Sequence, residues 1–67
     1  MEIRLNNEPV VIEGDGISLS RLLEIKKYTF RLRIVKINGR LIDRDNYDNE
    51  TVRDGDEVQV VYLMSGG

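Results

Sequence analysis

The sequence predicts an α+β protein in which one helix packs across a small mixed sheet. Several short segments rich in β-branched residues alternate between apolar and polar side chains, as half-buried strands do. One stretch, residues 18–27, has helical spacing instead. The chain has 67 residues, 40% of them hydrophobic, which is enough for one small core. We therefore expect one domain over residues 1–67.

The N-terminal segment "MEIRLNNEPVVIE" predicts a β-hairpin. Asn6 and Asn7 suit a two-residue turn that needs positive φ at both positions. This turn places Ile3 opposite Val10, so that one face of the hairpin is apolar. Because Pro9 lacks an N–H group, either the second strand lies at an edge of the sheet or Pro9 occupies a position whose N–H would be free.

The next segment, "GDGISLSRLLEIKK", predicts a helix of about ten residues. Ser18 is the expected N-cap after a glycine-rich turn. Glu24 and Lys27 have the spacing of an ion pair on the exposed side. Neither Gly nor Pro marks the end of the helix, which we place within residues 26–32. The leucines expected on the buried face are Leu19, Leu22 and Leu23.

Residues 28–37 are rich in β-branched and aromatic side chains and predict a strand that begins by about Arg33. Asn38-Gly39 is the strongest turn signal in the chain. It predicts that the following "RLI" folds back as a short partner strand.

A polar connection over residues 43–53 should contain two isolated apolar anchors, Tyr47 and Val52. A "DGD" turn at residues 54–56 then leads into the last strand, "EVQVVYLM". At an exposed edge of the sheet, an apolar strand of this length would promote aggregation by pairing with other chains. We therefore expect the last strand in the centre of the sheet, beside the first strand.

Both faces of the last strand carry apolar residues. Alternation puts Val58 and Val60 on one face and Val61 and Leu63 on the other. If the first pair faces the helix, the second pair faces solvent directly before residues 64–67. We interpret this face as a small docking patch that positions the tail in a partner, although scattered surface apolar residues are common. The predicted partner-binding residues are Val61, Leu63, Met64 and Ser65.

The composition excludes several functional classes. The chain has no Cys and no His, which removes thiolate chemistry and the commonest metal ligand and acid–base group. We expect no metal site and no bound cofactor, and we interpret the Asp54 and Asp56 carboxylates as turn chemistry, not as a catalytic pair. No signal peptide or membrane-length apolar run is present, so we expect a cytoplasmic protein without a membrane partner.

Charge is unevenly distributed along the chain, although the formal net charge is only −2. Residues 21–40 hold seven basic side chains and one acidic one, whereas residues 41–57 hold seven acidic and two basic ones. Such polarity either steers a charged partner or keeps ordinary surface segments solvated. Nucleic acid is not an expected partner because the basic stretch is short and the pI is about 5.0. We expect a monomer when the protein is free.

The chain resembles the ubiquitin-like β-grasp sulfur carriers. The turn at Asn38-Gly39, the "DGD" of residues 54–56 and the terminal Gly66-Gly67 occur in the order typical of that family. Within it, "INGRLIDRDNYDNETVRDGDEVQVVYLMSGG" is most similar to the ThiS family of thiamin thiazole synthesis. The resemblance covers the whole chain and implies a β-grasp fold with a flexible Gly-Gly tail over residues 64–67.

The resemblance also implies a sulfur carrier that is not itself an enzyme. In this family a ubiquitin-activating-like, ATP-dependent enzyme of the ThiF type adenylates the terminal carboxylate, here that of Gly67. Sulfur mobilised by a cysteine desulfurase then replaces AMP and leaves a thiocarboxylate, from which a ThiG-type thiazole synthase takes the sulfur. Gly66 and Gly67 have no Cβ atoms, so they can thread a narrow channel in a partner.

Other interpretations of the tail remain open at the level of sequence. Ser65-Gly66-Gly67 also resembles the end of the molybdopterin-synthase small subunit, although that group usually has prolines where this chain has residues 62–64. A ubiquitin-like protein modifier would instead join Gly67 to a lysine. The two glycines could also have no function.

Overall fold

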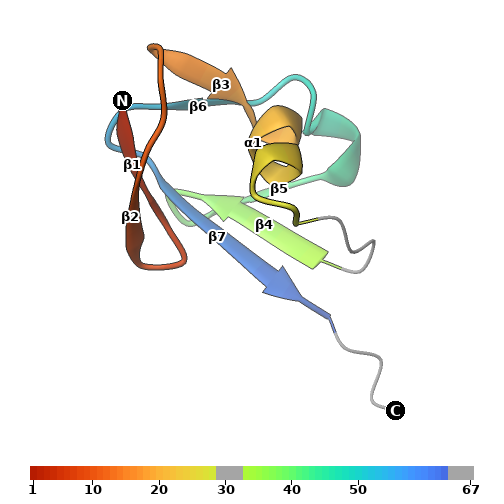
Figure 1. Cartoon of the computed structure of the whole chain (residues 1–67). Coiled ribbons are helices and arrows are strands. Elements are labelled where there is room, and N and C mark those ends of the chain that lie inside the picture. The colour runs from red at the N-terminus through yellow and green to blue at the C-terminus, as the bar shows by residue number, and fades with distance from the viewer. Residues whose placement is uncertain (29–32, 64–67) are drawn as a thin grey trace.

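The computed structural model describes residues 1–28 and 33–63, and it confirms the predicted α+β architecture (Figure 1). Its elements, in chain order, are β1 (Glu2–Leu5), β2 (Glu8–Val11), β3 (Gly16–Ser18), α1 (Leu19–Ile25), β4 (Arg33–Ile37), β5 (Arg40–Ile42), the 3-10 helix η1 (Arg44–Asn46), β6 (Thr51–Arg53) and β7 (Glu57–Tyr62).

The last strand, β7, lies in the centre of a five-stranded sheet with the order β2-β1-β7-β4-β5. It runs parallel to β1 and antiparallel to β4, so the prediction that it lies beside the first strand is confirmed. β2 is an edge strand, as Pro9 predicts. Figure 1 shows α1 on one side of this sheet and the end of β7 pointing away from the N-terminus.

Both predicted hairpin turns are confirmed by their backbone angles. Asn6 and Asn7 have φ values of 50° and 69°, and Ile3 pairs with Val10 as expected. Asn38 has a φ of 52° and is followed by a glycine that also has positive φ. Asparagine tolerates this left-handed region better than most residues, which is why these turns could be found in the sequence.

The helix begins as predicted, because the Ser18 side chain accepts a hydrogen bond from the backbone N–H of Arg21. It is shorter than predicted, with seven residues instead of about ten, and it ends at Ile25, just before the range 26–32 in which its end was expected. The predicted ion pair between Glu24 and Lys27 is wrong: Glu24 pairs with Arg21 inside the helix, whereas Lys27 lies beyond the helix end.

The helix ends in a Schellman motif without a glycine. The N–H of Tyr28 donates to the carbonyl of Leu23 at 2.8 Å, and the N–H of Lys27 donates to the carbonyl of Glu24 at 3.1 Å. Lys27 has a φ of 62°, which is the left-handed conformation that glycine usually supplies at this position. The sequence therefore lacked the usual stop signal, although the stop geometry is present.

A second, two-stranded sheet pairs β3 with β6, and the sequence analysis did not predict it. Each of its strands has only three residues, too few for alternation to show. The two anchors predicted in this region are confirmed, since Tyr47 and Val52 are buried. The hydrophobic core contains Ile3, Leu5, Leu19, Leu22, Leu23, Val35, Ile37, Ile42, Tyr47, Val52, Val58 and Val60.

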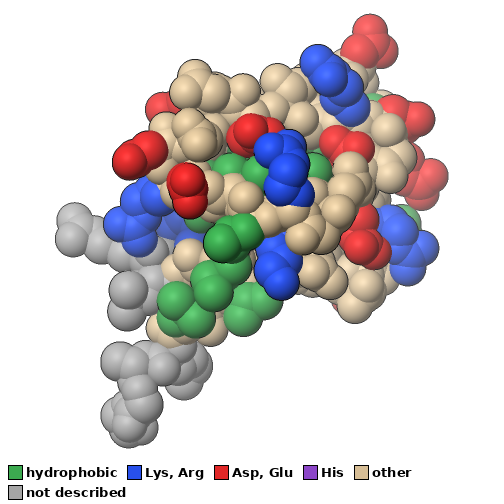
Figure 2. All heavy atoms as spheres, turned by 180° about the vertical axis from the view of Figure 1, so that it is seen from behind, with side chains coloured by type: hydrophobic (Ala, Val, Ile, Leu, Met, Phe, Trp, Pro, Cys, Tyr) green, Lys and Arg blue, Asp and Glu red, His purple; other side chains and the backbone are tan. Residues whose placement is uncertain are grey.

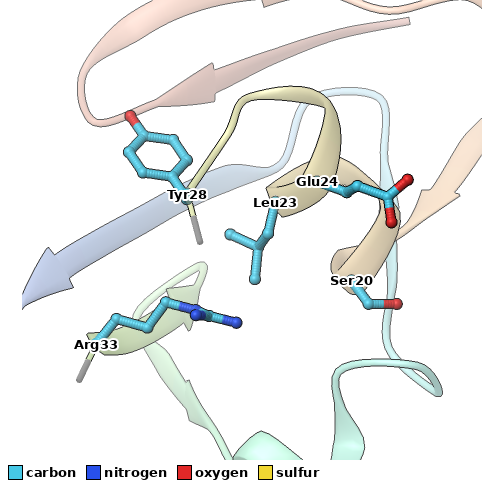
Figure 3. Close-up of a pocket in the computed structure, with 5 residues that line it drawn as sticks. All are labelled: Ser20, Leu23, Glu24, Tyr28 and Arg33. Atoms are coloured by element: carbon cyan, nitrogen blue, oxygen red, sulfur yellow. The ribbon is translucent and has the colours of Figure 1, made fainter. Parts of the chain in front are cut away.

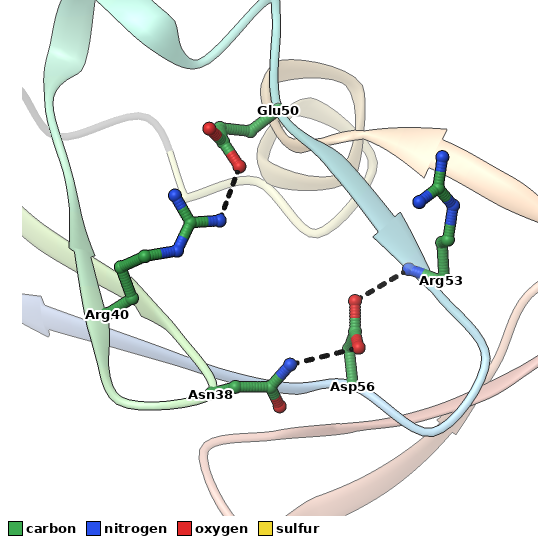
Figure 4. A network of polar contacts seen from close by, with 5 residues as sticks. All are labelled: Asn38, Arg40, Glu50, Arg53 and Asp56. Atoms are coloured by element: carbon green, nitrogen blue, oxygen red, sulfur yellow. Dashed lines mark hydrogen bonds and ion pairs between the residues drawn. The ribbon is translucent and has the colours of Figure 1, made fainter.

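Polar contacts hold the start of β7 in place (Figure 4). The carboxylate of Asp56 accepts hydrogen bonds from the Arg53 backbone N–H at 2.9 Å and from the Asn38 side-chain amide at 3.1 Å. The carboxylate of Asp54 accepts one from the Glu2 backbone N–H at 2.8 Å. The Asp56 carboxylate therefore serves the turn, as predicted, whereas the Asp54 carboxylate joins the turn to the start of β1. A separate ion pair joins Arg40 to the Glu50 carboxylate at 2.9 Å.

Candidate functional site

The candidate functional site is the end of β7 and the sheet surface beside it. Val61 and Leu63 are 55% and 47% exposed, whereas Val58 and Val60 are buried. The predicted alternation of faces is therefore confirmed. That Val61 and Leu63 bind a partner stays a prediction. The remaining predicted site residues lie outside the described residues: Met64, Ser65, Gly66 and Gly67.

Two further apolar residues extend this surface across the neighbouring strands. Ile34 of β4 is half-buried and pairs with Val61. Leu41 of β5 is exposed and pairs with Lys36, which lies two residues beyond Ile34 on the same face of β4. Figure 2 shows a cluster of hydrophobic side chains with Lys and Arg side chains beside it. The residues that form this sheet patch are Ile34, Leu41, Val61 and Leu63.

Ile34 and Leu41 were not among the predicted site residues, although the sequence contains the signals that place them there. Val35 and Ile37 were recognisable as inward-facing, so Ile34 had to face outward by alternation. The tight turn at Asn38-Gly39 then places Leu41 opposite Lys36. Combining the turn with the alternation would have predicted an apolar patch across three strands instead of one.

Side chains from two other segments fix the end of β7. The side-chain oxygen of Asn6 accepts a hydrogen bond from the Val60 N–H at 2.8 Å, and its amide nitrogen donates to the Tyr28 hydroxyl at 3.3 Å. The ring of Tyr28 lies 5.8 Å from the ring of Tyr62, between centroids. The turn of the first hairpin and the residue that follows the helix end therefore both contact the last residues of β7.

A pocket of about 270 Å³ lies between the helix and β4 (Figure 3). The Glu24 carboxylate on its rim is already ion-paired with Arg21, and the Arg33 guanidinium lies 5.3 Å from the centre of the Tyr47 ring. A nucleophile activated by histidine cannot form there, because the chain contains no His and no Cys. The pocket is lined by Ser20, Leu23, Glu24, Tyr28 and Arg33.

Two other kinds of site were sought in residues 1–28 and 33–63. This part of the chain contains no group of three or more acidic residues arranged to hold a metal ion. Within the same ranges, no helix has the length and apolarity that a membrane crossing requires.

Comparison with known proteins identifies the family. The model of the ThiS family matches residues 3–67. A crystal structure of a thiamine biosynthesis protein (ThiS) from Geobacter metallireducens is 32% identical and superposes with a TM-score of 0.89, and the match covers 100% of both chains. An NMR solution structure of a thiamine biosynthesis protein from the same organism is 31% identical, with a TM-score of 0.79, over 100% of this chain and 88% of that one.

A search of curated proteins found no match. The family match nevertheless spans almost the whole chain, and the central β7, the parallel β1 and the helix α1 form the β-grasp arrangement of the ThiS structure. The chain therefore belongs to the ThiS family of β-grasp sulfur carrier proteins.

Proposed function

We propose that this protein carries sulfur for the thiazole ring of thiamine as a thiocarboxylate at Gly67. The observation that carries the proposal is the family match, which runs through residue 67 and so includes both terminal glycines. The same match favours the thiazole branch over the molybdopterin-synthase alternative. The protein is then a co-substrate of partner enzymes, and the catalytic groups belong to those enzymes.

The chemistry requires activation because a carboxylate anion resists attack by a nucleophile. In the proposed first step, a carboxylate oxygen of Gly67 attacks the α-phosphorus of ATP and pyrophosphate leaves. The outer sulfur of a persulfide from a cysteine desulfurase system then attacks the acyl carbon of the adenylate, and AMP leaves. A thiol reductant cleaves the S–S bond of the resulting acyl disulfide, which leaves the thiocarboxylate on Gly67 and a disulfide on the sulfur donor. The absence of Cys and His means that no other group of this chain is suited to hold the sulfur.

The proposed partners are a ThiF-type adenylating enzyme and a ThiG-type thiazole synthase. We infer that the sheet patch docks on them, because its apolar side chains end at Leu63, directly before the proposed reactive segment. This patch is small, which suits partners that bind and release the carrier in each cycle. Met64 and Ser65 would enter the partner together with the two glycines.

The experiment is ATP–pyrophosphate exchange by a ThiF-type enzyme with wild-type protein, Gly67→Ala and Val11→Ala as substrates. A Cβ atom beside the reacting carboxylate should misplace it, so Gly67→Ala should lower the exchange rate about 100-fold. Val11→Ala is the control because Val11 is an exposed apolar residue on the edge strand β2, outside the tail and the sheet patch, and its rate should stay near that of the wild type. Exchange by Gly67→Ala at the wild-type rate would contradict the proposal.

A further inference from the structure

Charge is arranged along the direction of β7. Asp56 and Glu57 lie where the strand starts, and Asp54 lies in the preceding turn. At the other end, the ring of Tyr62 contacts the ring of Tyr28, which directly follows Lys26 and Lys27 in the chain. The two lysines therefore lie at the end of the molecule that leads toward residues 64–67, and the three carboxylates lie at the opposite end.

The two lysines differ from Asp54 and Asp56 in that their side chains make no hydrogen bond or ion pair within residues 1–28 and 33–63. Asp56 accepts a backbone hydrogen bond within its turn, and Asp54 accepts one from the start of β1. Lys26 and Lys27 are exposed, and neither side chain takes part in an ion pair within the residues that the structure describes. Their charges are therefore available to a partner.

The conformation of Lys27 is a second, independent observation. In the described residues, the other positions with positive φ are asparagines or glycines, which tolerate it. Glycine would be the more favourable residue at this helix end, because a lysine there is strained. A strained residue that persists at an exposed position points to a role for its side chain.

We propose that Lys26 and Lys27 form a basic docking site for an acidic rim on the adenylating enzyme, separate from the sheet patch. The inference rests on the proposed function. The adenylating enzyme must release each carrier after one activation, and complementary charge at a rim raises the association rate more than it slows release. The small sheet patch supplies the short-range contact, and the lysine pair orients the tail-bearing end during approach.

The test compares kcat/KM for the carrier in ATP–pyrophosphate exchange at low and high salt. Lys26→Glu should lower kcat/KM about 10-fold at low ionic strength with kcat unchanged, and the loss should shrink about threefold or more at high salt because exposed charges are screened. Arg53→Glu is the matched control, because it reverses one exposed charge on β6. It should change kcat/KM less than about twofold.

Lys27→Gly separates the proposed role from a structural one. Glycine relieves the backbone strain and removes the charge, so this variant should melt at a higher temperature and yet associate about threefold more slowly at low salt. Lys27→Arg keeps the charge and should associate like the wild type.

Three results would overturn the inference. Equal losses for Lys26→Glu and Arg53→Glu, or a loss that does not depend on salt, would overturn it while leaving the proposed function intact. No exchange with the wild-type protein would instead overturn the proposed function, and this inference with it.

Discussion

The side chain of Asn6 gives the most discriminating test of how the end of β7 is held. β1 pairs with β7 only as far as Leu5, beyond which the hairpin turns away. The side-chain oxygen of Asn6 supplies the acceptor that a longer β1 would have supplied, because it accepts a hydrogen bond from the Val60 N–H at 2.8 Å. Asn6→Gly removes this acceptor and keeps a residue that tolerates the observed φ of 50°.

The expected magnitude follows from the burial of the bond that is lost. The Asn6–Val60 hydrogen bond is partly buried, so leaving its N–H unsatisfied should cost about 1–2 kcal/mol. The bond to the Tyr28 hydroxyl is exposed and should add only about 0.5 kcal/mol or less. A domain of this size has a free energy of unfolding of about 3–5 kcal/mol. The midpoint of thermal unfolding should therefore fall by about 5–15 °C.

The assay is urea unfolding of Asn6→Gly beside Asn7→Gly, together with hydrogen exchange at the Val60 amide. Asn7 occupies the same turn with a φ of 69°, but within the described residues its side chain makes no hydrogen bond. Asn7→Gly should therefore leave the free energy of unfolding within about 0.5 kcal/mol of the wild type. Equal destabilisation by the two variants, or unchanged exchange at Val60 in Asn6→Gly, would refute the reasoning.

Three further predictions concern the core, the acidic turn and the sheet patch. Val52→Ala should lower the free energy of unfolding by about 2–3 kcal/mol, because Val52 is fully buried where β6 meets the core. A decrease of less than about 1 kcal/mol, measured by urea unfolding, would contradict this prediction. Asp56→Ala should cost about 1–2 kcal/mol in the same assay, because its carboxylate accepts two hydrogen bonds; no change would show that neither contributes. Val61→Asp should raise the KM of the adenylating enzyme for the carrier about 10-fold, while the melting temperature stays within a few degrees of the wild type. An unchanged KM would show that Val61 does not belong to the docking surface.

Much of this fold could be predicted because local signals and packing agree. The asparagine turns require positive φ, and asparagine is one of the few residues that adopt it readily. Alternation around these turns then fixes which side chains face the core. Pro9 favours an edge position for β2, because in a central strand its missing N–H would break the ladder of hydrogen bonds. The apolar last strand favours the centre, because at an exposed edge it would promote pairing with other chains.

The features that the sequence did not reveal depend on contacts between distant segments. The pairing of β3 with β6 joins residues more than thirty positions apart, such as Ile17 and Val52, through strands too short to alternate. The helix end depends on Lys27 adopting a glycine-like conformation. The β-branched Ile17 and Val52 favour an extended backbone, but they do not indicate which segments pair. Lysine does not favour the left-handed conformation that Lys27 adopts.

The site was predictable in part for the same reason. Val61 and Leu63 follow from alternation along one strand, whereas Ile34 and Leu41 join them only once the register of β4 and β5 is known. The hydrogen bond between the Asn6 side chain and the Val60 N–H joins residues near opposite ends of the chain, and no local sequence pattern predicts it.

The central claim is that Gly67 carries sulfur, and the intact mass of the protein tests it most directly. The untagged protein would be incubated with a ThiF-type enzyme, ATP and a sulfur donor, and the mass change would be located by fragmentation. We predict a gain equal to the exchange of one oxygen for one sulfur, located at Gly67 and reversed when ThiG-type thiazole synthase and its substrates are added. An unchanged mass, or attachment of Gly67 to a lysine of another protein, would contradict the account.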